Sequence, residues 1–180
     1  LIVPFVMLYT QGINDANYNQ FEFAVLIVLA HALHCIRLPY HMMIKASGRF
    51  KETQSNYFIA AIINLLVSII TVKLMGLIGV AIGTFIAMLY QTVWMAVYNS
   101  KNIFNRSIKM FIKLIMLDSL NVIIAVWIMF MLPMQANTII KWIFSAVIVF
   151  IIWTFIILVT NSIFYKDKVH LLIKKTKVRL

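Results

Sequence analysis

Hydrophobic residues fill five long stretches of the chain, and short polar segments separate these stretches. A helix that crosses a bilayer needs about 20 mostly apolar residues, and each stretch comes near that length, although the second is short. The predicted spans cover residues 21–43, 57–72, 77–98, 111–132 and 138–164. Only a tight turn separates the second span from the third, which predicts a helical hairpin.

Composition supports a membrane protein over a soluble domain. Hydrophobic residues make up 63% of the 180 residues, and charged residues make up 12%. A soluble domain has about 45–50% apolar and about 25% charged residues. Such an apolar chain could not cover its surface with polar groups in water, whereas lipid tails accept apolar side chains. The sequence therefore predicts an all-α, polytopic transmembrane helix bundle.

The positive charges predict how the bundle sits in the membrane. The chain carries a net charge of +11. With alternating spans, one side holds most of the lysines and arginines: Lys45, Arg49, Lys51, Lys101, Arg106, Lys109, Lys113, Lys166, Lys168, Lys174, Lys175, Lys177 and Arg179. Positive residues favour the cytoplasmic side, so the basic tail at 165–180 is predicted to be cytoplasmic and to meet anionic lipids. Because these charges flank membrane spans, nucleic acid is not an expected partner.

The first span carries the most informative polar residues. His31, His34, Arg37 and His41 fall within a 120° arc on one face at 100° per residue. Ionisable groups inside a bilayer usually face a water-filled cavity or a polar partner. One interpretation is a cationic strip along a pathway for an anionic solute such as a phosphate or an acidic sugar. The other is structural: Arg37 and His41 reach the interface, and the remaining histidines bond to neighbouring helices.

The second and third spans carry residues typical of close helix packing. Asn64, Ser68 and Thr71 form a narrow polar seam, which either binds helices together or lines the same cavity as the strip. Gly79 and Gly83 have the GxxxG spacing that lets two backbones approach closely. We interpret the two glycines as packing residues.

Asp118 is a carboxylate about two turns inside the fourth predicted span. It either binds a coupling ion, as buried carboxylates in transporters do, or pairs with a nearby lysine. No nucleophile–base pair, metal motif or glycine-rich phosphate loop is recognisable in the sequence. The segments DANY and GRFKETQ are placed in loops. The sequence therefore predicts neither an enzyme nor a cofactor nor a metal site.

The combination of three segments resembles the C-terminal half of bacterial polysaccharide flippases. These segments are PFVMLYTQGINDANY, IRLPYHMMIKASGRFKETQ and AAIINLLVSIITVKLMGLIGVAIGTFIAMLYQ. Such flippases belong to the superfamily of multidrug exporters, oligosaccharidyl-lipid flippases and polysaccharide exporters. The likeness covers roughly residues 4–91, and the last two spans share only their hydrophobicity with the family.

The resemblance implies a fold and a set of partners. Residues 1–98 would be part of the second lobe of a two-lobe transporter, namely the end of one span and three whole spans. Residues 99–164 would be two terminal helices. The opening residues also suggest that an N-terminal lobe precedes this chain. The other implied partners are membrane lipids, a lipid-linked oligosaccharide and the glycan polymerase machinery.

The implied function is transport of polyprenyl-pyrophosphate-linked oligosaccharide across the bacterial inner membrane, for O-antigen or capsule. Family members work by alternating access driven by an ion gradient, and the cationic strip around Arg37 agrees with an anionic cargo. An exporter of drugs or metabolites in the same superfamily is an alternative, although like charges would repel a cationic drug. A membrane enzyme of glycan assembly, such as a polymerase or an acyltransferase, is a weaker alternative, because the predicted outer loops are short. A purely structural subunit would leave the strip without a purpose.

Overall fold

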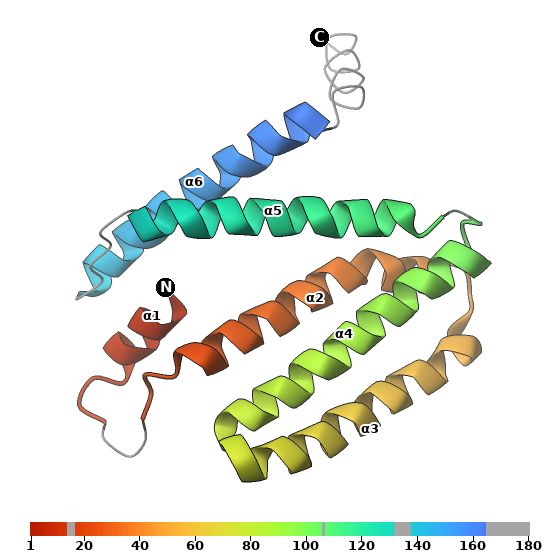
Figure 1. Ribbon diagram of the computed structural model, residues 1–180, viewed down its shortest axis with the longest axis horizontal. Coiled ribbons are helices and arrows are strands. Elements are labelled where there is room, and N and C mark those ends of the chain that lie inside the picture. The colour runs from red at the N-terminus through yellow and green to blue at the C-terminus, as the bar shows by residue number, and fades with distance from the viewer. Residues whose placement is uncertain (14–16, 106, 132–137, 165–180) are drawn as a thin grey trace. The chain divides into compact units, whose positions relative to one another are not determined.

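The computed structural model describes residues 1–13, 17–105, 107–131 and 138–164. These residues form six helices, shown in Figure 1: α1 (Ile2–Tyr9), α2 (Phe21–Ala46), α3 (Phe50–Met75), α4 (Leu77–Asn102), α5 (Lys109–Met131) and α6 (Ile139–Phe164). The described residues contain no strand. Helices α2 to α6 are long and apolar enough to cross a membrane. The prediction of an all-α, multi-pass helix bundle is confirmed.

Helices α2, α3 and α4 extend several residues beyond the predicted spans. Helix α3 begins at Phe50 rather than at residue 57, so most of GRFKETQ is helical and its placement in a loop was wrong. Likewise α2 ends at Ala46 and α4 at Asn102. Hydropathy marks only the segment that hydrocarbon tolerates, whereas intrahelical hydrogen bonds continue into the polar zone beyond it. Each helix therefore extends past its apolar run.

The chain divides into two compact units, residues 14–112 and residues 1–13 with 113–180. In the first, which we call the three-helix unit, α4 packs against both α2 and α3, while α2 and α3 barely meet. Figure 1 shows α4 between these two helices. The buried face of α4 is rich in small side chains, including Ala81, Gly83, Ala87 and Ala96. Small residues let helix backbones approach closely where water supplies no hydrophobic driving force.

The α3–α4 hairpin is the tightest contact of this unit. Gly76 turns the chain between the helices at a φ of 59°, a conformation that favours glycine. A Cβ atom on Gly79 would lie 2.3 Å from the backbone carbon of Thr71. The Thr71 hydroxyl donates a hydrogen bond to the Gly79 carbonyl oxygen over 2.7 Å. The geometry fits the close packing that the glycine spacing predicts.

Two side chains of α4 bind α2 in a regular register. The Thr92 hydroxyl donates to the Leu33 carbonyl oxygen over 3.1 Å, and the Asn99 amide donates to the Tyr40 carbonyl oxygen over 3.2 Å. Donors and acceptors advance by the same number of residues in the same direction along both helices. Helices α2 and α4 therefore run parallel, whereas the α3–α4 hairpin is antiparallel.

Replacing Thr92 with valine is expected to lower the free energy of unfolding by about 0.6 kcal/mol, the average for interhelical hydrogen bonds in membranes. Valine keeps the shape of threonine but loses the donor to Leu33. Thr84→Val is the matched control, because the exposed Thr84 hydroxyl bonds only to Val80 of its own helix. Unfolding in detergent micelles measures both variants. Equal effects of the two substitutions would show that the bond to Leu33 contributes nothing.

In the second unit, α1 packs against the beginning of α6. The Trp142 indole donates to the Leu1 carbonyl oxygen over 3.0 Å. Its ring lies 4.9 Å from that of Phe5. Elsewhere large apolar side chains remain exposed, with Phe130 of α5 86% exposed. A water-soluble domain rarely exposes such large apolar surfaces, whereas a lipid environment accommodates them.

Candidate functional site

The polar strip of α2 reaches the interior of the three-helix unit at Arg37. Arg37 is only 6% exposed, while His34 and His41 are half-buried and His31 is exposed. The His31 and His34 rings lie 5.8 Å apart, and the His41 ring lies 5.7 Å from that of Tyr57 on α3. The strip therefore has a buried centre at Arg37, and its two ends lie nearer the surface.

The Arg37 guanidinium is incompletely bonded. Its Nη2 atom donates to Nδ1 of His34 over 2.7 Å. Its Nη1 atom is buried without a hydrogen-bond partner. A buried donor left unpaired costs about 1–3 kcal/mol, and more when it is charged. Burial therefore leaves Arg37 with a cationic donor that an acceptor could satisfy.

No carboxylate balances this charge in the part of the chain that the structure describes. The ion pair recorded there joins Arg49 and Glu52, at 3.9 Å. The groups that interact electrostatically with Arg37 or His41 are Tyr57, His34 and Lys45. The region around Arg37 is therefore cationic, which suits an anionic ligand.

Two further asparagines contribute buried polar atoms to the three-helix unit. Asn56 of α3 is 1% exposed, and neither its amide nitrogen nor its oxygen has a partner. The side-chain oxygen of Asn99 on α4 is also buried and unpartnered. The sequence reasoning missed both residues because it assigned them to loops. Their helical spacing from Ala60 and Met95, at i and i+4, was the signal for a buried face.

Asn64 and Ser68 lie at the α3–α4 contact. The Ser68 hydroxyl donates to the Asn64 side-chain oxygen over 3.1 Å. A Cβ atom on Gly83 would lie 2.1 Å from Oγ of Ser68. Ser68 thus packs directly on the glycine face of α4, which is what the helix-packing interpretation predicts. No described contact connects either residue with Arg37.

Asp118, the residue predicted to bind a coupling ion or to pair with a lysine, is exposed on α5 and belongs to the second unit. One turn further, Asn121 is buried, and its side-chain oxygen has no partner. Among the described residues, no three His, Cys, Asp or Glu side chains lie close enough to hold a metal ion. The role of Asp118 stays a prediction.

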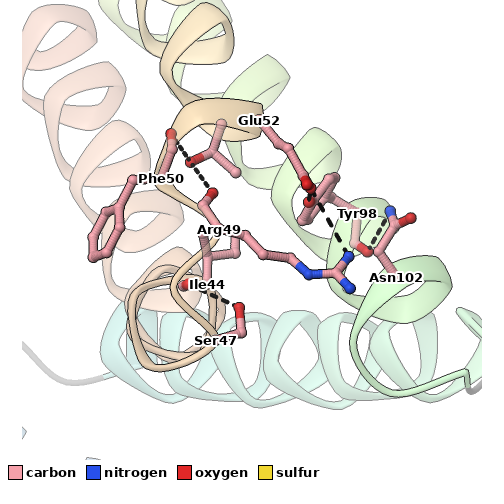
Figure 2. A network of polar contacts seen from close by, with 8 residues as sticks. Ile44, Ser47, Arg49, Phe50, Glu52, Tyr98 and Asn102 are labelled. Atoms are coloured by element: carbon pink, nitrogen blue, oxygen red, sulfur yellow. Dashed lines mark hydrogen bonds and ion pairs between the residues drawn. The ribbon is translucent and has the colours of Figure 1, made fainter.

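A polar network outside the strip ties the start of α3 to the end of α4. Figure 2 shows Arg49 directed at Glu52, next to Tyr98, whose phenol donates a hydrogen bond to Glu52. The hydrogen bond with Tyr98 raises the pKa of the exposed Arg49, which stays charged at physiological pH. The Asn102 amide donates to the Tyr98 carbonyl oxygen over 3.1 Å. We interpret this network as a structural link between the start of α3 and the end of α4.

A broad, open groove of about 650 Å³ follows the exposed face of α3. Lys51, Gln54 and Ser55 line it, together with Tyr57, Phe58 and Ala61. All of these residues belong to one helix, α3, so the groove does not enclose a ligand. The strip on α2 is therefore the stronger candidate site.

Comparison with known proteins identifies no relative of this chain. No family model, curated protein or solved structure matches the chain.

Proposed function

We propose that this chain is part of a flippase of the bacterial inner membrane that moves polyprenyl-pyrophosphate-linked oligosaccharides to the outer leaflet, for surface polysaccharide synthesis. The observation that carries the proposal is Arg37, a cation buried among apolar helices with a free donor at Nη1. Guanidinium binds phosphate through paired N–H groups, and a diphosphate is the anionic part of such a substrate.

The proposed setting follows from the charges and the helices. The side that holds most lysines and arginines would be cytoplasmic, with the C-terminus there. The three-helix unit would belong to the second of two lobes that rock about a central cavity. The first lobe and the glycan polymerase machinery are the proposed protein partners. The resemblance in residues 4–91 supports this assignment, and an ion gradient is the proposed energy source.

The proposal is tested by complementation. The whole protein, including the first lobe, is expressed in a strain that lacks its own flippase, and surface glycan is measured at matched protein levels. Arg37→Ala is expected to lower surface glycan at least tenfold, because the substrate loses its cationic partner. Arg37→Lys should retain part of it, since lysine keeps the charge but not the paired donors. Lys51→Ala, an exposed lysine outside the strip, is the control and should behave as wild type.

Full surface glycan in Arg37→Ala would show that the strip is structural. If wild type restores no glycan but vesicles containing it take up a free anionic metabolite, the protein is an exporter of small anions instead. That alternative uses the same cation and differs only in whether the cargo carries a lipid.

A further inference from the structure

We propose that the Tyr57 side chain is a gate that closes the Arg37 site toward the proposed cytoplasmic side of the three-helix unit. The inference rests on the function proposed above, because it describes how an anion reaches a buried cation. Arg37 is only 6% exposed, so a ligand from solution needs a path that is closed in this structure.

The contact that closes this path joins α2 and α3. His41 lies one helical turn beyond Arg37, on the same face of α2 and nearer the end of the helix at Ala46. The His41 ring lies 5.7 Å from the Tyr57 ring of α3. Tyr57 also interacts electrostatically with Arg37. The Tyr57 ring therefore lies between α2 and α3, close to the cation and to the turn that follows it.

The backbones on both sides of this contact are held by α4, so the opening falls to side chains. Helices α2 and α3 barely meet, while both pack against α4. Hydrogen bonds from Thr92 and Asn99 hold α2, and the close approach at Gly79 holds α3. Separating the His41 and Tyr57 rings breaks none of these contacts.

The Tyr57 ring has space to move into. Tyr57 is 37% exposed and also lines the open groove of about 650 Å³ on α3. Rotation about χ1 toward this groove takes the ring away from His41 and opens the surroundings of Arg37 to the groove. Exposed side chains change rotamer within nanoseconds, so this gate opens faster than the packed helices can move.

A buried position on α4 offers a place to measure access to the site. The Thr92 hydroxyl of α4 donates to the Leu33 carbonyl oxygen of α2. Four residues further along these two parallel helices lie Ala96 and Arg37, at the same level. Ala96 is 2% exposed, so a cysteine there reacts with a reagent in solution only when the site opens.

The test compares labelling rates of this cysteine. The whole protein carries Ala96→Cys, and its other cysteines, Cys35 included, are changed to alanine. A negatively charged methanethiosulfonate is added to inside-out vesicles, from the proposed cytoplasmic side. Minor conformations are commonly populated at about 0.1–10%, so Tyr57→Ala should raise the rate constant of labelling by about tenfold or more.

Matched variants assign this effect to the ring of Tyr57. Tyr57→Phe keeps the ring and should label as slowly as wild type, whereas the milder truncation Tyr57→Leu should accelerate labelling. Phe58→Ala removes a 70% exposed ring from the same groove and should leave the rate unchanged. Ala87→Cys, at a position of α4 that is 5% exposed, detects a general loosening of the unit. It should label equally slowly with and without the Tyr57 ring.

Inorganic diphosphate separates the gate from the anion site. It should slow the labelling of Ala96→Cys in the Tyr57→Ala protein, and this protection should disappear when Arg37→Ala is added. Labelling that stays slow in both Tyr57→Ala and Tyr57→Leu overturns the gate, as does equal acceleration in Phe58→Ala or at Ala87→Cys. Acceleration by Tyr57→Ala without protection by diphosphate leaves the gate standing and overturns the anion site.

Discussion

Replacing Arg37 with methionine is expected to stabilise the three-helix unit by about 2 kcal/mol and to abolish transport. Arg37 is 6% exposed, one of its terminal nitrogens has no partner, and no described carboxylate pairs with it. Apolar residues that replace buried charged groups are often neutral or stabilising. Methionine is flexible enough to fill the vacated space.

The free energy of unfolding in detergent micelles and surface glycan at matched protein level are the two measurements. Lys51→Met is the control, because it removes an exposed positive charge and should change neither quantity by much. A residue that is kept for function at the expense of stability should show opposite changes in the two. If Arg37→Met unfolds more easily than wild type, Arg37 holds the helices together and its role is structural.

Replacing Gly79 with alanine is expected to destabilise the α3–α4 hairpin by about 3 kcal/mol, at the upper end of the usual range for overpacking. The added Cβ would lie 2.3 to 2.5 Å from backbone atoms of Thr71 and Val72, which cannot rotate away. The helices must separate, and the hydrogen bond from Thr71 to the Gly79 carbonyl oxygen is lost with them. Unfolding in micelles measures the loss.

Substitutions at neighbouring positions serve as comparisons for the loss of stability in Gly79→Ala. Val80→Ala, at an exposed position next to Gly79, should cost little. Gly83→Ala should have an intermediate cost, because its nearest obstacle is the Ser68 hydroxyl at 2.1 Å, with backbone atoms at 2.9 Å. Adding Ser68→Ala to Gly83→Ala should recover part of the lost stability. Equal stabilities of Gly79→Ala and Val80→Ala would contradict the close approach of the two backbones.

The sequence predicted the helices well and their ends less well. Apolar runs located five membrane-spanning helices because a bilayer imposes both length and hydrophobicity. The polar first turns of α3, from Phe50 to Asn56, escaped this criterion because hydropathy cannot distinguish a polar helix end from a loop.

The candidate site was predicted in outline only. Helical periodicity placed Arg37 and the three histidines on one face, but the burial of Arg37 depends on how α4 packs against α2. The sequence pattern does not predict how these two helices cross. Asn56 and Asn99 were missed for the same reason that the helix ends were, since both lie beyond the apolar runs.

The register between α2 and α4 limits how these helices can move past each other. Thr92 and Asn99 hold backbone oxygens of Leu33 and Tyr40, so both bonds lie two helical turns apart on each helix. If one helix slid along the other, a donor would next meet one of these two oxygens only after a shift of seven residues, or about 10 Å. Such a shift is a third of the hydrocarbon thickness. Gating movements within this pair that keep both bonds should therefore be tilts or rotations about the shared axis, whereas translation along it would break both.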